Sequence, residues 1–356
     1  MQRRKLGESG LEVPAVVLGA WAIGGWQWGG SDDALAERAI HQAIDCGMNA
    51  IDTAPVYGFG HSEQVIGRAV VGRRDSVLLF TKVGFNWNDT RGEFAFETVG
   101  NAGQPLRVYR NSRPWAVVRE VEDSLKRLRT DRIDLIQVHR RDATTRIADT
   151  MQALANLHRA GKVRAIGVSN FSVEMLIEAR QALGSIPLAS EQPKYSLVAR
   201  EAERKLLPWA LRHGVGTLVY SPLEQGLLTG KVTPERVFSE TDARRKRPTF
   251  TPTNRLRVMQ LLDRVVLPIA ERHAATPAQV VIAWTVAQPG VTCAIVGART
   301  PEQVLENARG GELRLDSGEL ASMRAAFEAL QLEGVRQPSF LRRLLERLSA
   351  IRRRRT

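Results

Sequence analysis

The fold is decided by residues 134–168, which begin with the apolar run DLIQVH (134–139), continue with the helical pattern IADTMQALANLHRA (147–160) and end with a second apolar run, AIGV (165–168). Such a sequence of run, helix and run predicts two parallel strands joined by a crossover helix. The same unit recurs along the chain, although no internal sequence repeat accompanies it. The strand-like runs are Ala15–Leu18, Ala50–Asp52, Val77–Thr81, Asp134–His139, Ala165–Val168, Leu188–Gln192, Gly216–Tyr220 and Cys293–Val296.

Helical patterns alternate with these runs. They lie at Asp33–Cys46, Glu63–Val70, Pro114–Leu128, Ile147–Ala160, Val173–Ala182, Glu201–Arg212, Leu256–Ala287 and Pro301–Ala308, and a further helix is expected at Gly318–Leu330. Eight strand–helix units predict an α/β protein with a single (β/α)8 TIM barrel, because eight parallel strands close a barrel. A doubly wound sheet is the alternative, but it would normally carry G-x-G-x-x-G after its first strand, and the chain has no such motif.

Capping residues support several of the helix boundaries. Ser31 and Asp32 precede the first helix, Ser62 the second and Ser172 the fifth. Side chains of these types accept hydrogen bonds from the free N–H groups of a helix start. Glycines occur where three helices should stop, and glycine favours the backbone conformation found there. These glycines are Gly47, Gly161 and Gly214.

Two connections are much longer than the usual ~2–6 residues of such loops. They are Val83–Arg113, after the third strand, and Pro222–Arg255, after the seventh. Both leave the C-terminal ends of strands, where barrel enzymes build their active sites. The first connection is rich in aromatic residues, so we expect it to form a pocket wall or a lid. These aromatic residues are Phe85, Trp87, Phe94, Phe96 and Tyr109.

The charge of the chain is concentrated at its C-terminus. The formal net charge is +13, and residues 340–356 contain seven arginines and one glutamate, which gives +6 for this segment. Leucine and isoleucine fall at helical spacing between the arginines, which is typical of an amphipathic helix. We therefore divide the chain into a barrel domain, residues 1–333, and a basic helical tail, residues 334–356. The tail is expected either to be solvated or to dock on the barrel, a partner or an anionic surface.

Composition also limits the compartment. Cys46 and Cys293 lie in separate apolar segments and make no disulfide framework, which favours a reducing compartment. No apolar run approaches the ~18 residues of a transmembrane helix, and the N-terminus lacks the apolar stretch of a signal peptide. A cytoplasmic protein is expected, and its oligomeric state, including a possible homo-oligomer, stays open.

Four polar residues lie at or just beyond strand ends: Asp52, Tyr57, Lys82 and His139. Each alone has a structural explanation, such as a core histidine or a surface lysine. In a barrel, however, all four side chains point to the same mouth, and buried charges are costly unless they are paired. Their convergence predicts an active site.

These residues also carry a resemblance to a known family. The chain resembles the aldo-keto reductases from about Arg4 to Leu330, in the family's order and spacing, with its general-stress and inositol-operon branch in bacteria most similar in appearance. The matching segments are AIDTAPVYG (50–58), TK (81–82), QVH (137–139), IGVSNF (166–171), YSPL (220–223), GLLTGK (226–231) and VGAR (296–299).

The resemblance implies reversible hydride transfer between NADP(H) and a small, aromatic or sugar-like aldehyde or ketone. Tyr57 is then the general acid and base, and a cation at Lys82 is expected to lower the pKa of its hydroxyl from ~10. Asp52 pairs with Lys82, and His139 orients the substrate carbonyl or assists proton transfer.

The resemblance also implies the cofactor-binding residues. Ser169, Asn170 and Gln192 are expected to hold the nicotinamide carboxamide, and Tyr220 to stack on its ring. Arg299 is expected to bind a 2′-phosphate, which favours NADPH over NADH because no acidic residue stands beside it in the sequence. Along the pyrophosphate we expect Ser221, Pro222, Leu223, Gly226, Leu228, Gly230 and Lys231. At the adenosine end we expect Gly297, Gln303, Glu306 and Asn307.

Substrate-pocket candidates are less determined. Trp21 and Trp28 follow the first strand among glycines, and Trp87 lies in the long aromatic connection. Arg140 and Arg141 follow His139, where family members often have tryptophan and proline. Arg140 either contacts an anionic substrate or, equally, points to solvent.

The sequence leaves room for functions other than a reductase. A slow-turnover, cofactor-binding regulatory or redox-sensing protein on the same fold is the main alternative. A nucleic-acid binder is disfavoured because the arginine-rich tail has no interleaved aromatic residues and the chain has no recognisable module. The six histidines are scattered, so no metal site is expected.

Overall fold

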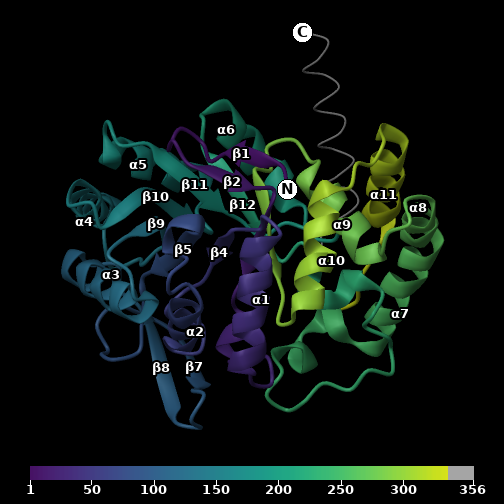
Figure 1. Cartoon of the computed structure of the whole chain (residues 1–356), viewed down its shortest axis with the longest axis horizontal. Coiled ribbons are helices and arrows are strands. Elements are labelled where there is room, and N and C mark those ends of the chain that lie inside the picture. Colours follow the sequence, from purple (N-terminus) through teal and green to yellow (C-terminus); the bar gives the residue numbers. More distant parts are fainter. Residues whose placement is uncertain (336–356) are drawn as a thin grey trace.

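The computed structural model describes residues 1–335, so the predicted basic tail, residues 334–356, lies almost wholly outside the described part. Eight parallel strands form a closed barrel with helices around it (Figure 1). This arrangement confirms the predicted (β/α)8 TIM barrel. Around the barrel the strands follow the order β10 (Val163–Ser169), β11 (Leu188–Gln192), β12 (Gly216–Tyr220), β13 (Cys293–Gly297), β3 (Val16–Gly19), β4 (Ala50–Asp52), β5 (Leu78–Val83) and β9 (Ile133–Val138).

A helix follows each barrel strand and packs on the outside of the sheet. These helices are α1 (Asp33–Asp45), α2 (His61–Ala69), α3 (Pro114–Leu128), α4 (Ile147–Arg159), α5 (Val173–Leu183), α6 (Leu206–Arg212), α9 (Pro277–Val286) and α10 (Pro301–Glu312). The predicted block 256–287 is divided into α7 (Pro252–Leu261), a π-helical turn (Leu262–Val266), α8 (Leu267–Arg272) and α9. The last helix, α11 (Ser317–Ala329), follows α10.

Two of the predicted caps are confirmed and one is wrong. Asp32 accepts a hydrogen bond from Leu35 N, and Ser172 accepts one from Met175 N. Ser62 does not cap α2, which begins at His61 after Gly60 at φ 100°. The Ser62 hydroxyl instead donates to Ala20 O at 3.0 Å and lies within the helix. The helix therefore starts where glycine can adopt a left-handed backbone.

The barrel interior is filled with apolar side chains. A hairpin that the sequence analysis did not predict, β1 (Arg3–Lys5) and β2 (Glu12–Pro14), precedes the first barrel strand. Leu6 and Leu11 of this hairpin pack with Phe80 and Leu135 inside the barrel. Because side chains alternate along a strand, Phe80 pointing inward places Lys82 on the same inner face, nearer the C-terminal end of β5. The barrel interior is thus apolar except at its C-terminal mouth, where the charged Lys82 side chain lies.

The first long connection contains a three-stranded sheet, which the sequence analysis did not predict. Residues 84–111, the hairpin sheet, contain β6 (Phe85–Asn86), β7 (Glu93–Val99) and β8 (Pro105–Arg110) in the antiparallel order β6-β8-β7. It projects from the bottom of the molecule in Figure 1. Its two ends meet, since Asn111 N donates to Gly84 O at 3.0 Å and Phe85 pairs with Arg110.

The second long connection has no strands. Residues 221–251, the arginine loop, contain the 3-10 helices η4 (Glu224–Thr229), η5 (Ala243–Lys246) and η6 (Pro248–Phe250). Ser221, Glu224 and Gln225 all have positive φ, which is uncommon for residues with a side chain. The arginine loop therefore follows an irregular path across the mouth of the barrel.

Candidate active site

Three of the predicted polar residues meet around one ammonium group. Lys82 Nζ donates to Asp52 Oδ1 at 2.6 Å and to Thr53 O at 2.9 Å, and it lies 3.4 Å from the Tyr57 hydroxyl. The Asp52 and Lys82 side chains are buried. Because β4 and β5 are neighbours in the barrel, their C-terminal ends bring these residues together.

The Tyr57 side chain is positioned by a tight loop after β4. Gly58 has φ 68°, and a Cβ at this position would lie 2.2 Å from Gly24 O. Only glycine allows this approach. The close contact fixes the loop that bears Tyr57 against the loop that follows β3.

The second oxygen of Asp52 is also engaged. Gln192 Nε2 donates to Asp52 Oδ2 at 2.8 Å, and Gln137 Nε2 donates to the same atom at 3.2 Å. The sequence analysis did not propose a role for Gln137, although it lies two residues before His139 on an inward-facing position. A carboxylate that accepts bonds at both oxygens is held in one orientation.

His139 lies on the other side of Tyr57. The centres of the two rings are 5.9 Å apart and nearly perpendicular, and Phe85 of the hairpin sheet packs 4.9 Å from the imidazole. The four predicted residues thus converge at one end of the barrel.

The protonation states follow from burial and charge. Burial raises the pKa of the Tyr57 hydroxyl above its usual 10.0, although the charges of Lys82 and Arg140 oppose this shift. The Lys82 charge acts to lower this pKa, as expected, but the loss of solvation is larger and the net shift is upward. Burial opposes the charge on Lys82, but Asp52 and Tyr57 bring the pKa of Lys82 above its usual value. Burial and the charges of Lys82 and Arg140 hold the pKa of His139 well below 6.5, so the imidazole is neutral.

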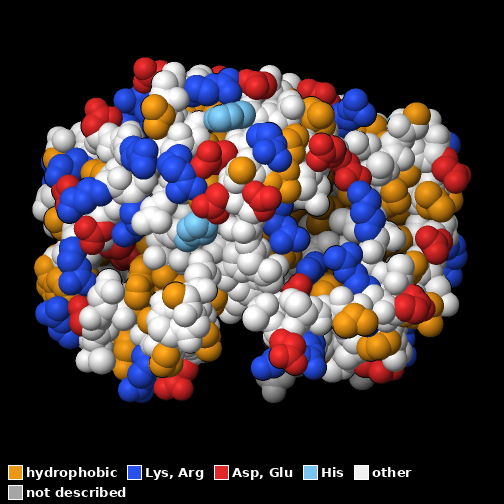
Figure 2. All heavy atoms as spheres, turned by 60° about the horizontal axis from the view of Figure 1, so that its bottom comes forward, with side chains coloured by type: hydrophobic (Ala, Val, Ile, Leu, Met, Phe, Trp, Pro, Cys, Tyr) orange, Lys and Arg blue, Asp and Glu red, His pale blue; other side chains and the backbone are white. Residues whose placement is uncertain are grey.

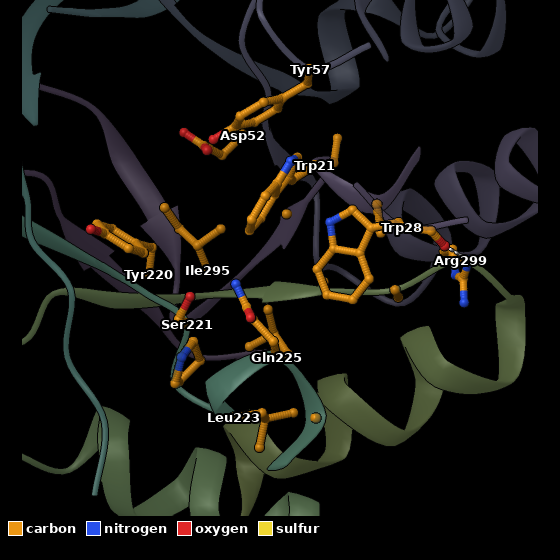
Figure 3. Close-up of a pocket in the computed structure, with 18 of the residues that line it drawn as sticks. Trp21, Trp28, Asp52, Tyr57, Tyr220, Ser221, Leu223, Gln225, Ile295 and Arg299 are labelled. Carbon is orange, nitrogen blue, oxygen red and sulfur yellow. Dashed lines mark hydrogen bonds between the residues drawn. The ribbon is translucent and has the colours of Figure 1, made fainter. Parts of the chain in front are cut away.

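A cavity of about 480 Å³ opens beside these groups. In Figure 3, Asp52 and Tyr57 lie at one end of it, and Arg299 lies at the other, beyond Trp28. Tyr57 and His139 line the cavity, whereas Lys82 lies behind them and is fully buried. A long cavity with a proton donor at one end and a guanidinium at the other suits an elongated, anionic ligand next to a smaller one.

The profile of the Aldo/keto reductase family matches residues 15–328. The chain belongs to the aldo/keto reductase family.

Relatives of this aldo/keto reductase cover almost its whole length. It is 38% identical over 306 residues to aldo-keto reductase YhdN of Bacillus subtilis (strain 168), covering 85% of this chain and 87% of that protein. It is 36% identical over 337 residues to an NADH-specific methylglyoxal reductase of Escherichia coli (strain K12), covering 93% and 100%. The structure of a glycerol dehydrogenase from Gluconobacter oxydans superposes with a TM-score of 0.80 at 36% identity, covering 94% of this chain and 99% of that one.

Most of the residues predicted to bind cofactor line the cavity of this aldo/keto reductase. Two do not: Leu228 is fully buried in the apolar core, and Gly230 forms a turn at φ 75° against Pro277. Those that line it are Ser169, Asn170, Gln192, Tyr220, Ser221, Pro222, Leu223, Gly226, Lys231, Gly297, Arg299, Gln303, Glu306 and Asn307.

Asn170 is held in an unusual conformation at φ 62°. Tyr220 Oη donates to Asn170 Oδ1 at 2.9 Å, and Asn170 Nδ2 donates to His139 O at 3.2 Å and to Ser169 Oγ at 2.8 Å. Backbone strain of this kind persists only where neighbouring contacts impose it. These contacts fix Asn170 beside His139 at the proton-donor end of the cavity.

The far end of the cavity is cationic. Arg299 Nη1 donates to Trp28 O at 3.4 Å, and Arg244 lies over the Trp28 ring at 4.9 Å. Arg236 and Arg244 also line the cavity, and the sequence analysis missed both because they lie in the arginine loop, outside any motif. Asp242 lies beside these arginines and pairs with Arg244 at 2.6 Å. Glu306 pairs with Lys231 across the cavity at 2.9 Å.

Aromatic residues also line the cavity. Trp21, Trp26, Phe85 and Phe96 do so at the proton-donor end, and Trp28 does so next to Arg299. Trp87 does not line the cavity: its ring lies 5.3 Å from that of Phe59, behind the first layer of the same aromatic cluster. The predicted pocket position of Trp87 is therefore not found in this structure.

Among the helices of residues 1–335, none is long and apolar enough to cross a membrane. Nor does this part of the chain bring together three or more histidine, cysteine, aspartate or glutamate side chains in a way that could hold a metal ion.

Proposed function

We propose that this aldo/keto reductase catalyses reversible hydride transfer between NADPH and an aldehyde or ketone, with Tyr57 as proton donor and acceptor. The observation that supports this most is the contact of one buried ammonium, Lys82 Nζ, with both the Asp52 carboxylate and the Tyr57 hydroxyl at the end of the cavity. The same end is lined by aromatic side chains that suit a small or aromatic carbonyl compound.

Tyr57 is suited to protonate the carbonyl oxygen. In the reductive direction this oxygen gains negative charge and takes a proton from the nearest acid. Burial keeps the pKa of Tyr57 above 10.0, so its hydroxyl carries a proton at neutral pH. After the proton leaves, the Lys82 ammonium at 3.4 Å stabilises the phenolate, and Asp52 holds the ammonium in place.

His139 is suited to orient the substrate. Its imidazole is neutral because burial and two nearby cations disfavour a further positive charge. A neutral imidazole still has one N–H, which can donate to the carbonyl oxygen. With the Tyr57 hydroxyl, this donor would hold the oxygen from two directions.

The cavity fits a nicotinamide dinucleotide, which supplies the hydride when it is bound. Tyr220 offers a flat ring and Asn170 an amide at the proton-donor end, while Arg299, Arg244 and Arg236 offer donors that match phosphate oxygens at the other end. The carboxylates of Asp242 and Glu306 are paired, so neither is free to favour a ribose hydroxyl. This cationic end supports NADPH over NADH.

The test is the oxidation of NADPH and, separately, NADH by the purified protein with an aromatic aldehyde, followed by nicotinamide absorbance. Tyr57→Phe keeps the ring and removes the proton, so we expect a loss of about 10²- to 10⁴-fold in kcat with little change in NADPH affinity. Equal kcat/KM for the two coenzymes would contradict the preference for NADPH. Tight NADPH binding without turnover would favour the slow-turnover regulatory function instead.

A further inference from the structure

Two arginines at the proton-donor end have no acidic partner of their own. Arg140 follows His139 at the end of β9, and Arg247 lies in the arginine loop between η5 and η6. Within residues 1–335, neither guanidinium makes an ion pair or a side-chain hydrogen bond. Lysine and arginine side chains gather around the hollow in this face of the molecule (Figure 2).

Arg140 is directed at the catalytic residues and not only at solvent. It lines the cavity, and its charge adds to the lowering of the His139 pKa and opposes the rise that burial causes in the pKa of Tyr57 and of Tyr220. Arg140 and the next residue, Arg141, are both exposed, but only Arg140 lines the cavity. Of the two orientations left open for Arg140 by the sequence, the structure therefore favours the one toward the substrate.

Arg247 approaches the same space from the opposite loop. Its guanidinium carbon lies 5.9 Å from the centre of the Trp21 ring, which in turn lies 6.2 Å from the Tyr57 ring. Its charge interacts with Tyr220, as does that of Arg140. The indole N–H of Trp21 is buried and has no acceptor, so a third donor lies at this end.

The acidic groups nearest Arg247 cannot neutralise it fully, because each has another partner. Glu224 pairs with Lys194 at 3.0 Å and accepts from Ser196 Oγ at 2.8 Å. Asp242 pairs with Arg244. A half-buried guanidinium without an acceptor is costly, and an anion supplied by a ligand would remove that cost.

We infer that the substrate is an anionic carbonyl compound, an aldehyde or ketone that carries a carboxylate or phosphate, and that Arg140 and Arg247 hold its anionic group from two sides. This inference rests on the proposed function and deepens it. The reacting carbonyl would lie at Tyr57, the hydrocarbon part would contact Trp21, Trp26, Phe85 and Phe96, and the anion would lie between Arg140 and the Arg247 guanidinium beside Trp21. The arginines at the other end, Arg236, Arg244 and Arg299, are left for the cofactor.

The test compares two aldehydes of almost equal size, 4-carboxybenzaldehyde and its neutral amide, 4-formylbenzamide. The native protein should have the higher kcat/KM with the carboxylate. Arg140→Gln and Arg247→Gln should each lower the carboxylate-to-amide ratio about 10- to 100-fold, since hydrogen bonds to charged groups are worth that much. Arg141→Gln, the matched control, should leave the ratio unchanged. A native preference for the amide, or a ratio unchanged in both variants, would overturn the inference.

Two further measurements separate this inference from its alternatives. The Kd of NADPH should change little in either variant, and weaker NADPH binding with an unchanged ratio would assign Arg247 to the cofactor and overturn the inference. Benzoate should bind the NADP+-loaded protein at least about tenfold more tightly than benzamide, measured by quenching of tryptophan fluorescence. This readout needs no turnover, so it supports or overturns the anion site even if the proposed reductase activity fails.

Discussion

The hairpin sheet and the arginine loop start from equivalent places, the C-terminal ends of barrel strands, yet they are built differently. The hairpin sheet satisfies its backbone through its own ladder and presents Phe85 and Phe96 to the cavity. The arginine loop has 3-10 turns and positive φ angles and presents Arg236 and Arg244. An apolar wall needs only side chains on a firm surface, whereas anion binding needs donors free to face a ligand. The comparison suits a division of roles: the regular hairpin sheet contacts an apolar part of a ligand, and the irregular arginine loop contacts an anionic part.

Asp52→Asn is expected to have the largest effect, because it removes the carboxylate charge that pairs with Lys82 between the two loops. Lys82 would be left as a buried cation without a carboxylate, which should cost about 3 kcal/mol in the free energy of unfolding and abolish most turnover. Denaturant unfolding and kcat/KM measure the two effects. Asp134→Asn is the control, because Asp134 is a buried partner of Arg74 and Arg164 that does not line the cavity. It should destabilise the protein and leave kcat/KM intact; full activity of Asp52→Asn would refute the predicted role.

Arg244→Ala tests the arginine loop alone. It removes a cation from the cofactor end and leaves Asp242 unpaired beside it. The Kd of NADPH should therefore rise about 10- to 100-fold, with a smaller change for NADH. Arg245→Ala is the control on the same loop, because Arg245 is exposed, does not line the cavity and has its guanidinium 3.4 Å from Glu240. If both variants bind NADPH equally well in titration calorimetry, the loop does not act through Arg244.

Phe96→Ala tests the hairpin sheet alone. It removes an aromatic ring that lines the cavity and stacks on Trp26 at 5.9 Å. KM for an aromatic aldehyde should rise about tenfold, as expected for the loss of a large apolar contact, while the Kd of NADPH stays the same. Phe94→Ala is the control, because Phe94 lies on the same strand and is 48% exposed. A change in NADPH affinity with Phe96→Ala would break the division of labour between the two loops.

Thr98→Val is expected to have the smallest effect and tests what holds the hairpin sheet in place. Thr98 Oγ1 accepts a hydrogen bond from Trp26 Nε1 at 3.0 Å, and valine has nearly the same shape without the acceptor. The loss of about 1 kcal/mol should raise KM for aromatic aldehydes a few-fold and leave kcat unchanged. Steady-state kinetics with aldehydes of increasing size would show it, and an equal response to small and large aldehydes would argue against a positioning role for this bond.

The barrel could be predicted from the sequence because each strand–helix unit carries its own periodicity. The convergence of Asp52, Tyr57, Lys82 and His139 follows from the barrel alone, since parallel strands end at one mouth. The hairpin sheet was not predicted, because its turns and aromatic residues resemble those of a loop. Its strands pair only with one another, and the sequence does not show that pairing.

Properties that depend on three-dimensional burial could not be predicted. The sequence shows that Lys82 can approach Tyr57, but not that loss of solvation outweighs its charge and raises the phenol pKa. Ser62 has the right residue type for a cap, yet its hydroxyl bonds to Ala20 O, a partner 42 residues away. Arg236 and Arg244 reach the cavity through an irregular backbone that no motif marks.

Because the two ends of the hairpin sheet meet, the sheet is an insertion that could be exchanged without changing the barrel. Asn111 N bonds to Gly84 O, so residues 84–111 leave and re-enter the barrel at nearly one point. Exchange of such a segment for another of different length changes mainly the entropy of closing one loop, and that entropy varies slowly with length. Evolution or an engineer could therefore replace this wall of the cavity as a unit, while the register of β5 and β9 and the position of Lys82 stay as they are.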